Sequence, residues 1–100
     1  MDFNGIEGFD WDEGNSRKSV ERHGVSQAEA EQVFRDPRLL VSSDDKHSVS
    51  EPRFHALGTT EAGRSLQVTF TLRASATKIR VISARDMNRK EKDHYEEEET

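Results

Sequence analysis

The sequence predicts a small α+β domain in which two helices precede an antiparallel sheet and a third helix follows it. Three observations support this class. Apolar residues recur at helical spacing up to residue 36, and the apolar period changes to two between residues 39 and 84. A charged stretch with a helix-capping pattern then closes the chain. The 100 residues suffice for one domain with one modest core, so 1–100 is treated as a single unit.

The N-terminal third is expected to hold a short strand and two helices. Residues 9–12 alternate aromatic and acidic side chains, which predicts a short strand with both rings on one face. A first helix is predicted over residues 15–23. Ser26 and Glu29 form a capping box that starts a second helix, and Asp36-Pro37 stops it.

Four strands of an antiparallel meander are predicted next. They span residues 39–43, 53–59, 66–72 and 78–84. The third is the clearest, because each of its even-numbered positions is apolar. Gly63 supplies the positive φ of the hairpin turn that precedes this strand. A meander beside two helices is consistent with the α+β class.

Residues 78–95 are the most basic segment, with six basic residues against three acidic ones. The segment is expected to begin as a strand, turn at 83–86 and continue as a charged helix capped by Asn88 and Glu91. This helix has little apolar surface and should dock lightly on the sheet. Arginines held at a strand end suit bidentate phosphate recognition. A solvated strand and helix is the alternative interpretation.

Much of the chain's negative charge lies near its two ends. Its net charge is −5, its mean hydropathy is −0.96, and 31% of its residues are hydrophobic. Residues 1–13 carry five acidic side chains, and residues 96–99 are four glutamates. Without these nine, the body of the domain is basic by four charges. The acidic ends are solubilising tails or screens for a basic face, and residues 96–100 are expected to be disordered.

The composition excludes several classes of protein. There is no cysteine, so disulfides, thiolate metal sites and cysteine nucleophiles are excluded. No apolar run is long enough for a membrane span and no signal-peptide pattern opens the chain, so a cytoplasmic protein without a membrane partner is expected. The histidines make no metal-binding pattern and no nucleotide-binding loop is present, so no metal or cofactor is expected.

Metal-free cleavage of RNA remains compatible with these residues. The RNA supplies its own 2′-hydroxyl as nucleophile, so the protein needs only a base, an acid and cations near the phosphate. The available cations are Arg53, Arg64, Arg80 and Arg85, and the available proton-transferring groups are His47, His55, Glu51, Glu91 and Tyr95. Further RNA contacts are expected from the basic side chains Lys78, Arg89, Lys90 and Lys92.

Several of these residues also have a structural interpretation. Glu91 suits a helix cap and an arginine partner as well as a base. Tyr95 can pack its ring against the sheet, while Phe9 and Trp11 suit a core better than a base-stacking platform. Arg80 lies inside a strand beside apolar neighbours, so it should need an anionic partner, either Glu91 or a substrate phosphate.

A set of motifs in a fixed order resembles the BrnT family of type II toxin–antitoxin ribonuclease toxins over about residues 9–96. The motifs are FDWDEGN (9–15), RHGVS with AEA (22–30), VFRDP (33–37), His47 with Glu51 and Arg53, Gly58, GRSLQV (63–68) and IRVISARDMNRKEKDHY (79–95). The resemblance implies a RelE-like fold and metal-independent cleavage of cellular RNA that halts translation and growth. It also implies a BrnA-like ribbon–helix–helix antitoxin, which neutralises the toxin and with it represses their shared operon by binding operator DNA.

Carried over by motif, the same resemblance implies two groups of site residues. Phosphate would be handled by Arg53, Arg64, Arg80 and Arg85, and supporting or proton-transferring roles would fall to His47, Glu51, Glu91 and Tyr95. Two further hypotheses stay open beside the enzyme. One is a catalytically inactive homologue that binds antitoxin and regulates the operon. The other is a non-enzymatic nucleic-acid-binding domain with its positive face along residues 78–92.

Overall fold

The chain folds into a five-stranded sheet with three helices in a computed structural model that describes residues 3–47 and 51–97. The elements in chain order are β1 (Gly8–Phe9), α1 (Glu13–His23), α2 (Gln27–Val33), β2 (Leu40–Ser43), a 3₁₀ turn (Asp45–His47), β3 (Phe54–Thr59), β4 (Ser65–Arg73), β5 (Lys78–Asp86) and α3 (Arg89–Glu97). The strand order is β1-β5-β4-β3-β2. β1 runs parallel to β5 and the other neighbours are antiparallel. The α+β class is therefore confirmed, with a mixed sheet in place of a purely antiparallel one.

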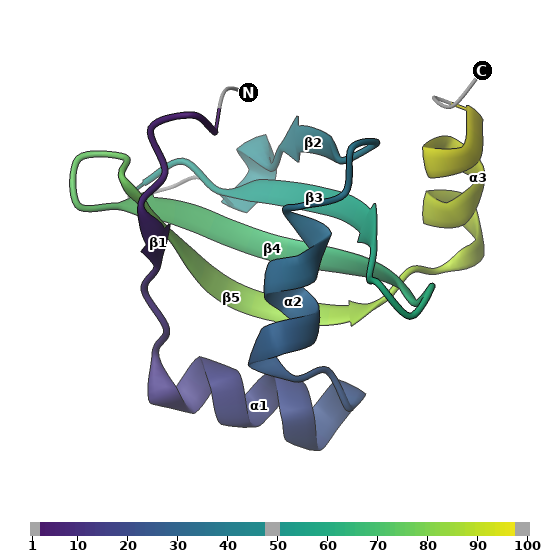
Figure 1. Cartoon of the computed structure of the whole chain (residues 1–100), viewed down its shortest axis with the longest axis horizontal. Coiled ribbons are helices and arrows are strands. Elements are labelled where there is room, and N and C mark those ends of the chain that lie inside the picture. Colours follow the sequence, from purple (N-terminus) through teal and green to yellow (C-terminus); the bar gives the residue numbers. More distant parts are fainter. Residues whose placement is uncertain (1–2, 48–50, 98–100) are drawn as a thin grey trace.

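The two N-terminal helices and the C-terminal helix lie on different parts of the sheet. Figure 1 shows α1 and α2 on one side and α3 beside the end at which β3 and β5 finish. We call the side covered by α1 and α2 the helix face, and the opposite side the open face. α3 docks there through Met87 and Tyr95, which pack against Leu57 and Leu40.

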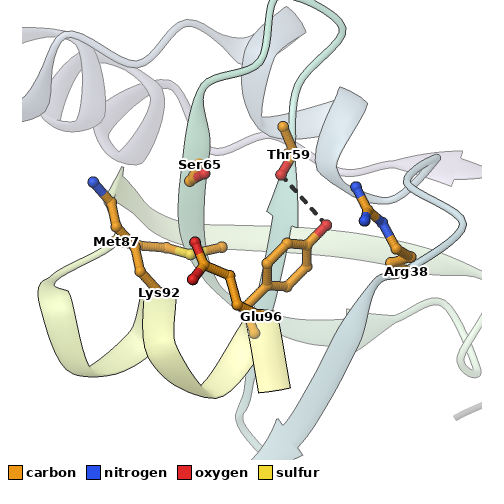
Figure 2. Close-up of a pocket in the computed structure, with 7 residues that line it drawn as sticks. Arg38, Thr59, Ser65, Met87, Lys92 and Glu96 are labelled. Atoms are coloured by element: carbon orange, nitrogen blue, oxygen red, sulfur yellow. Dashed lines mark hydrogen bonds between the residues drawn. The ribbon is translucent and has the colours of Figure 1, made fainter. Parts of the chain in front are cut away.

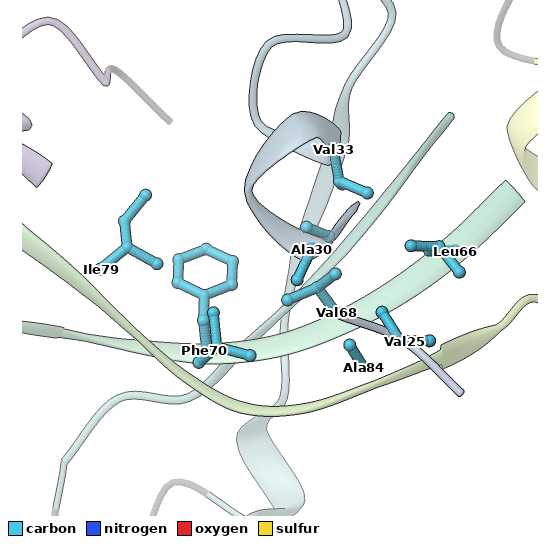
Figure 3. Packing of buried hydrophobic residues seen from close by; sticks show 10 residues of the cluster. Val25, Ala30, Val33, Leu66, Val68, Phe70, Ile79 and Ala84 are labelled. Atoms are coloured by element: carbon cyan, nitrogen blue, oxygen red, sulfur yellow. The ribbon is translucent and has the colours of Figure 1, made fainter. Parts of the chain in front are cut away.

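The main core lies between the helix face and the two N-terminal helices. Figure 3 shows side chains of α2 meeting the apolar positions of β4 and β5. Phe70 is fully buried at its centre, and its ring lies 5.1 Å from that of Phe34 and 5.5 Å from that of Phe54, measured between centroids. Gly58 lets α2 approach β3 closely, because a Cβ there would lie 2.8 Å from Val33 Cγ1. This core gives β4 and β5 a fixed orientation.

Local signals predicted most boundaries well. Both capping boxes are present: Ser26 exchanges hydrogen bonds with Glu29 at the start of α2, and Asn88 with Glu91 at the start of α3. Gly63 has a φ of 87° in the predicted hairpin turn. Glu96 and Glu97 belong to α3, while the rest of the expected disordered tail lies outside the described residues.

Two predictions at element ends are wrong. The turn expected at 83–86 does not form, because these residues continue β5 and pair with residues 66–69 of β4. The strand expected at 9–12 is only Gly8–Phe9. It is cut short because the side chain of Asp12 accepts hydrogen bonds from the amides of Gly14 and Asn15, which starts α1 two residues early. Phe9 and Trp11 both pack against the core, as expected.

Candidate functional site

A row of polar side chains crosses the open face along β4 and β5, and a β-bulge aligns it. The cross-strand pairs are Thr71 with Arg80, Thr69 with Ser83 and Gln67 with Arg85. The register shifts between Thr69 and Phe70, so that Ile82 is an extra residue in β5. Arg80 and Arg85 are five positions apart, and strict alternation would put them on opposite faces. The bulge brings both onto the open face.

Where this row meets α3, the open face forms a shallow pocket of about 300 Å³, which we call the α3 pocket. The strands contribute Ser42, His55, Leu57, Gln67 and Arg85, and α3 contributes Lys90, Glu91 and His94. The pocket thus gathers two permanent cations, two imidazoles and one carboxylate within the reach of one small ligand.

Arg85 is held at the wall of this pocket by Glu91. Its two terminal nitrogens each donate to a Glu91 oxygen at 2.8 Å, and one also donates to the carbonyl of Asp86 at 3.1 Å. Burial alone would raise the pKa of Glu91, but hydrogen bonds from Arg85 and from the Asn88 amide outweigh it and lower that pKa. Three of the five guanidinium N–H donors are used in these contacts. No other acceptor for Arg85 is found within the described part of the chain, so two of its N–H donors remain for a ligand.

His55 is fixed by contacts on both ring nitrogens. Nε2 lies 3.1 Å from Asp44 Oδ2, and Nδ1 lies 3.0 Å from Thr69 Oγ1 and close to the amide nitrogen of Gln67. This pattern assigns the proton to Nε2, which donates to Asp44, while Nδ1 accepts. Asp44 also contacts His47 Nδ1 at 3.0 Å. Burial opposes ionisation of Asp44, but its bonds to His47 and the nearby imidazoles lower its pKa. His55 is therefore a rigid wall of the pocket.

His94 differs from His55. It is exposed on α3 and lines the pocket, and its ring makes no hydrogen bond or ion pair with another described residue. Both ring nitrogens are thus available to a ligand. The other two groups in the pocket that can transfer protons, His55 and Glu91, are both bonded to described residues, whereas His94 is not.

Tyr95 points away from the α3 pocket. Its hydroxyl donates to Asp36 Oδ2 and accepts from Thr59 Oγ1 at 3.3 Å, a bond drawn in Figure 2. Burial of Tyr95, together with its bond to Asp36, raises its pKa. Asp36 also accepts from the Thr59 amide at 2.8 Å and the Arg38 amide at 2.9 Å. Tyr95 therefore ties α3 to the end of α2 and to β3.

A second pocket, of about 400 Å³, lies on that side of α3. Arg38 and Lys92 stand on opposite sides of it, as Figure 2 shows. Tyr95 and Thr59 form part of its lining. The helix thus separates this pocket from the one that holds Arg85.

Arg64 is saturated by contacts within the protein. It donates twice to Asp86, at 2.7 and 3.1 Å, once to Glu29 at 3.1 Å, and to the carbonyls of His23 and Gly24. These five bonds use all five guanidinium donors. The bond from Arg64 lowers the pKa of Asp86, and the reciprocal interaction raises that of Arg64. Arg64 lies on the helix face, where it joins the β3–β4 hairpin to the end of α1.

The partner of Arg80 corrects a sequence-based expectation. Glu91 was one of its two expected partners, but Glu91 is engaged by Arg85, and Arg80 pairs with Asp10 at 3.0 Å. β1 brings Asp10 there by pairing with β5. Glu51 likewise lies away from the α3 pocket, 3.1 Å from Arg73.

The other candidates are dispersed around these clusters. Arg53 directly precedes β3, and its carbonyl accepts from the Asp44 amide. Lys78 is exposed at the start of β5, and Arg89 pairs loosely with Asp93 on the outer side of α3. Of the candidates named from the sequence, those that line the α3 pocket are His55, Arg85, Lys90 and Glu91.

Sequence reasoning did not assign His94, Gln67 or Ser42 to the site. The signal for His94 was its spacing of four residues from Lys90, which places both on one side of a helix. Gln67 and Ser42 carry no local signal, because only the strand register brings them to the pocket. Within residues 3–47 and 51–97 no group of three or more acidic or imidazole side chains is arranged to hold a metal ion. None of the helices there could cross a bilayer.

Comparisons with known proteins agree with this architecture. The family model described as "Ribonuclease toxin, BrnT, of type II toxin-antitoxin system" matches residues 11–91. The fold is similar to the crystal structure of the Brucella abortus ribonuclease toxin BrnT, with a TM-score of 0.63 and 20% identity over 82% of this chain and 97% of that one. No curated protein sequence matches. Because the family model spans most of its length, the chain belongs to the BrnT family of ribonuclease toxins of type II toxin–antitoxin systems.

Proposed function

We propose that this protein is a metal-independent endoribonuclease that cleaves RNA in the α3 pocket and so inhibits translation and growth. The RNA 2′-hydroxyl attacks the adjacent phosphorus, a 2′ O–P bond forms, and the P–O5′ bond breaks to leave a 2′,3′-cyclic phosphate. The 2′-hydroxyl loses one proton and the departing 5′ oxygen gains one. The protein must therefore supply positive charge at the phosphate and at least one group that transfers protons.

The side chains that line the α3 pocket support this proposal. Arg85 would bind the scissile phosphate through its two remaining N–H donors, with Lys90 adding a second positive charge. Glu91 would orient Arg85, because its lowered pKa keeps it ionised and paired. His94, with both ring nitrogens uncommitted to the described residues, would transfer the proton.

The single observation that carries this proposal is the juxtaposition of Arg85, Lys90 and His94 around one pocket on the open face. Arg64 is consumed by internal contacts, and Tyr95 points to the far side of α3. We assign them to the structure of the site and not to its chemistry.

We extend the proposal to a partner. As a family member the protein should be neutralised in the cytoplasm by a BrnA-like ribbon–helix–helix antitoxin, and the complex should bind operator DNA through the antitoxin. RNA is the proposed substrate. The proposed cleavage requires no cofactor, because Arg85 and Lys90 supply the positive charge at the phosphate.

The test is cleavage of single-stranded RNA in EDTA by the wild type and three variants. Arg85→Gln and His94→Gln should each lower the rate at least ~100-fold, the scale of losing one transition-state charge donor or one proton-transferring group. Arg17→Gln is the matched control, because Arg17 is a 65%-exposed arginine on α1, on the helix side. Equal rates for all four proteins would contradict the assignment and indicate a contaminating nuclease or another site.

A second function is favoured by one observation: Arg64, Arg80 and Arg85 are each paired with carboxylates. A protein that keeps these pairs when RNA is offered would occupy an antitoxin and regulate the operon without cleaving RNA. Absence of cleavage by wild-type protein that still binds its antitoxin would support this alternative, once ribosome-bound RNA has also been offered.

A further inference from the structure

A second cluster lies on the open face, at the opposite end of the polar row from the α3 pocket. Thr71 is directly across the strand pair from Arg80, and Arg73 is two positions further along β4, opposite Lys78. Directly opposed side chains have Cβ atoms about 5 Å apart, and diagonal ones about 7–8 Å. Thr71, Arg73 and Arg80 therefore form one compact group.

This group contains polar atoms without partners. Thr71 Oγ1, Arg73 Nε and Arg80 Nε are buried atoms with no hydrogen-bond partner among the described residues. Thr71 itself is only 1% exposed. Buried polar groups in native proteins are normally hydrogen-bonded, and three neighbouring exceptions on one face call for an explanation. All three can donate to the same kind of acceptor.

The charges of the cluster favour an anion as that acceptor. Three basic side chains, Arg73, Lys78 and Arg80, adjoin each other, although like charges placed directly opposite destabilise a sheet. Two carboxylates partly neutralise them: Asp10 lies 3.0 Å from Arg80 and Glu51 lies 3.1 Å from Arg73. Both carboxylates come from outside β4 and β5, and each contacts only a terminal guanidinium nitrogen. They leave the Nε donors and the Thr71 hydroxyl unused.

We propose that Thr71, Arg73 and Arg80 form a second phosphate-binding subsite, which holds the RNA backbone away from the cleaved bond. The inference rests on the proposed ribonuclease function and extends it to substrate length. Thr71 and Gln67 are four positions apart on β4, which corresponds to about 13 Å at ~3.3 Å per residue. A phosphate in this subsite is thus not the one beside Arg85. The enzyme gains affinity from strands that are long enough to reach both places.

Binding of uncleavable 2′-deoxy strands tests the subsite independently of catalysis. The probes are a dinucleotide and a strand of about eight nucleotides, a length within the range that single-strand-binding folds cover. The variants are Arg73→Gln and Thr71→Val, with Arg17→Gln as the control. Arg73 is 41% exposed and valine is nearly isosteric with threonine, so both variants should fold.

Arg73→Gln should weaken binding of the longer strand about tenfold, as expected for losing a charge-assisted hydrogen bond. It should also reduce the slope of log affinity against log salt by about 0.7. Dinucleotide binding should not change. Thr71→Val should weaken the longer strand's binding in the same direction but less, without a change in slope.

Equal affinity of wild type and Arg73→Gln for the longer strand would overturn the subsite, and so would an equal loss for both strands. Failure of the catalytic proposal gives a different pattern. In that case the wild type does not cleave RNA, yet the length-dependent loss of binding in Arg73→Gln persists.

Discussion

The two faces of the sheet use the same strands for different purposes. On the helix face, β4 and β5 present Leu66, Phe70 and Ile79 to α1 and α2, and these side chains are at most 1% exposed. On the open face the same strands present threonines, a glutamine and arginines, and α3 covers part of them. Stability is therefore concentrated on one face, and the other can hold charges that do not help the fold.

The arginines show the same difference at the level of single residues. Arg64, on the helix side, donates all five of its N–H groups to protein acceptors. Arg85, on the open face, donates three, and Arg80 has a buried Nε without a partner in the described chain. An arginine with unused donors can bind phosphate without breaking the fold, whereas a saturated one cannot.

The largest effect is expected for Phe70→Ala on the helix face. Phe70 is fully buried among Phe3, Phe34 and Phe54, so its truncation removes apolar burial and leaves a cavity. The free energy of unfolding should fall by about 3–5 kcal/mol. Urea titration followed by circular dichroism measures it. A loss below about 1 kcal/mol would mean that the helix face is not the main source of stability.

A smaller loss is expected for Arg64→Lys. Lysine keeps the charge but cannot reach Asp86, Glu29 and the end of α1 together, because an ammonium lacks the planar fork. The free energy of unfolding should fall by about 2 kcal/mol. Thermal unfolding beside the exposed Arg17→Lys control measures the difference. An unchanged melting temperature would show that the contacts of Arg64 are dispensable.

Acid should destabilise the protein through carboxylates that link elements together. Folding lowers the pKa of Asp36, where bonds from Tyr95 and two amides outweigh burial, and that of Asp86, chiefly through Arg64. Below their ordinary pKa values, near 4, the unfolded chain binds more protons than the folded one. The stabilisation is thus complete above that pH and is lost as the pH falls through the lowered pKa.

The melting temperature should therefore fall between about pH 5 and pH 3. Asp36→Asn should be less stable at pH 7 and should show a shallower decline, because one of the titrating groups is absent. A wild-type melting temperature that stays constant or rises over this range would contradict the role given to these carboxylates.

The smallest effect is a gain, expected for Thr71→Val on the open face. The buried hydroxyl of Thr71 has no partner among the described residues, and valine removes it while keeping nearly the same shape. The free energy of unfolding should rise by about 1 kcal/mol. A more stable protein that binds long RNA less well would show a polar group kept for binding at a cost in stability. Destabilisation by Thr71→Val would mean that the hydroxyl is already satisfied.

Local sequence signals accounted for much of the fold. The capping boxes at Ser26 and Asn88 and the alternation in β4 act over a few residues, so they can be read without tertiary structure. The bulge at Ile82 could not be read in this way, since it is defined by the partner strand. The predicted turn at 83–86 failed for the same reason.

The site was less accessible to sequence reasoning. Glu91 was correctly considered as an arginine partner, but the choice between Arg80 and Arg85 depends on which residue the bulge turns toward α3. The saturation of Arg64 depends on Glu29, on Asp86 and on carbonyls at the end of α1. Such long-range contacts leave no periodic pattern in the chain.

The most direct test of the division between the faces compares Arg85→Gln with Arg64→Lys in one experiment. RNA cleavage in EDTA is divided by the folded fraction, and the melting temperature is measured on the same samples. We expect Arg85→Gln to lose at least ~100-fold in rate with a stability loss of only about 1 kcal/mol. Arg64→Lys should melt earlier and cleave normally per folded molecule. The reverse pattern, with activity lost in Arg64→Lys and kept in Arg85→Gln, would contradict the division of roles between the two faces.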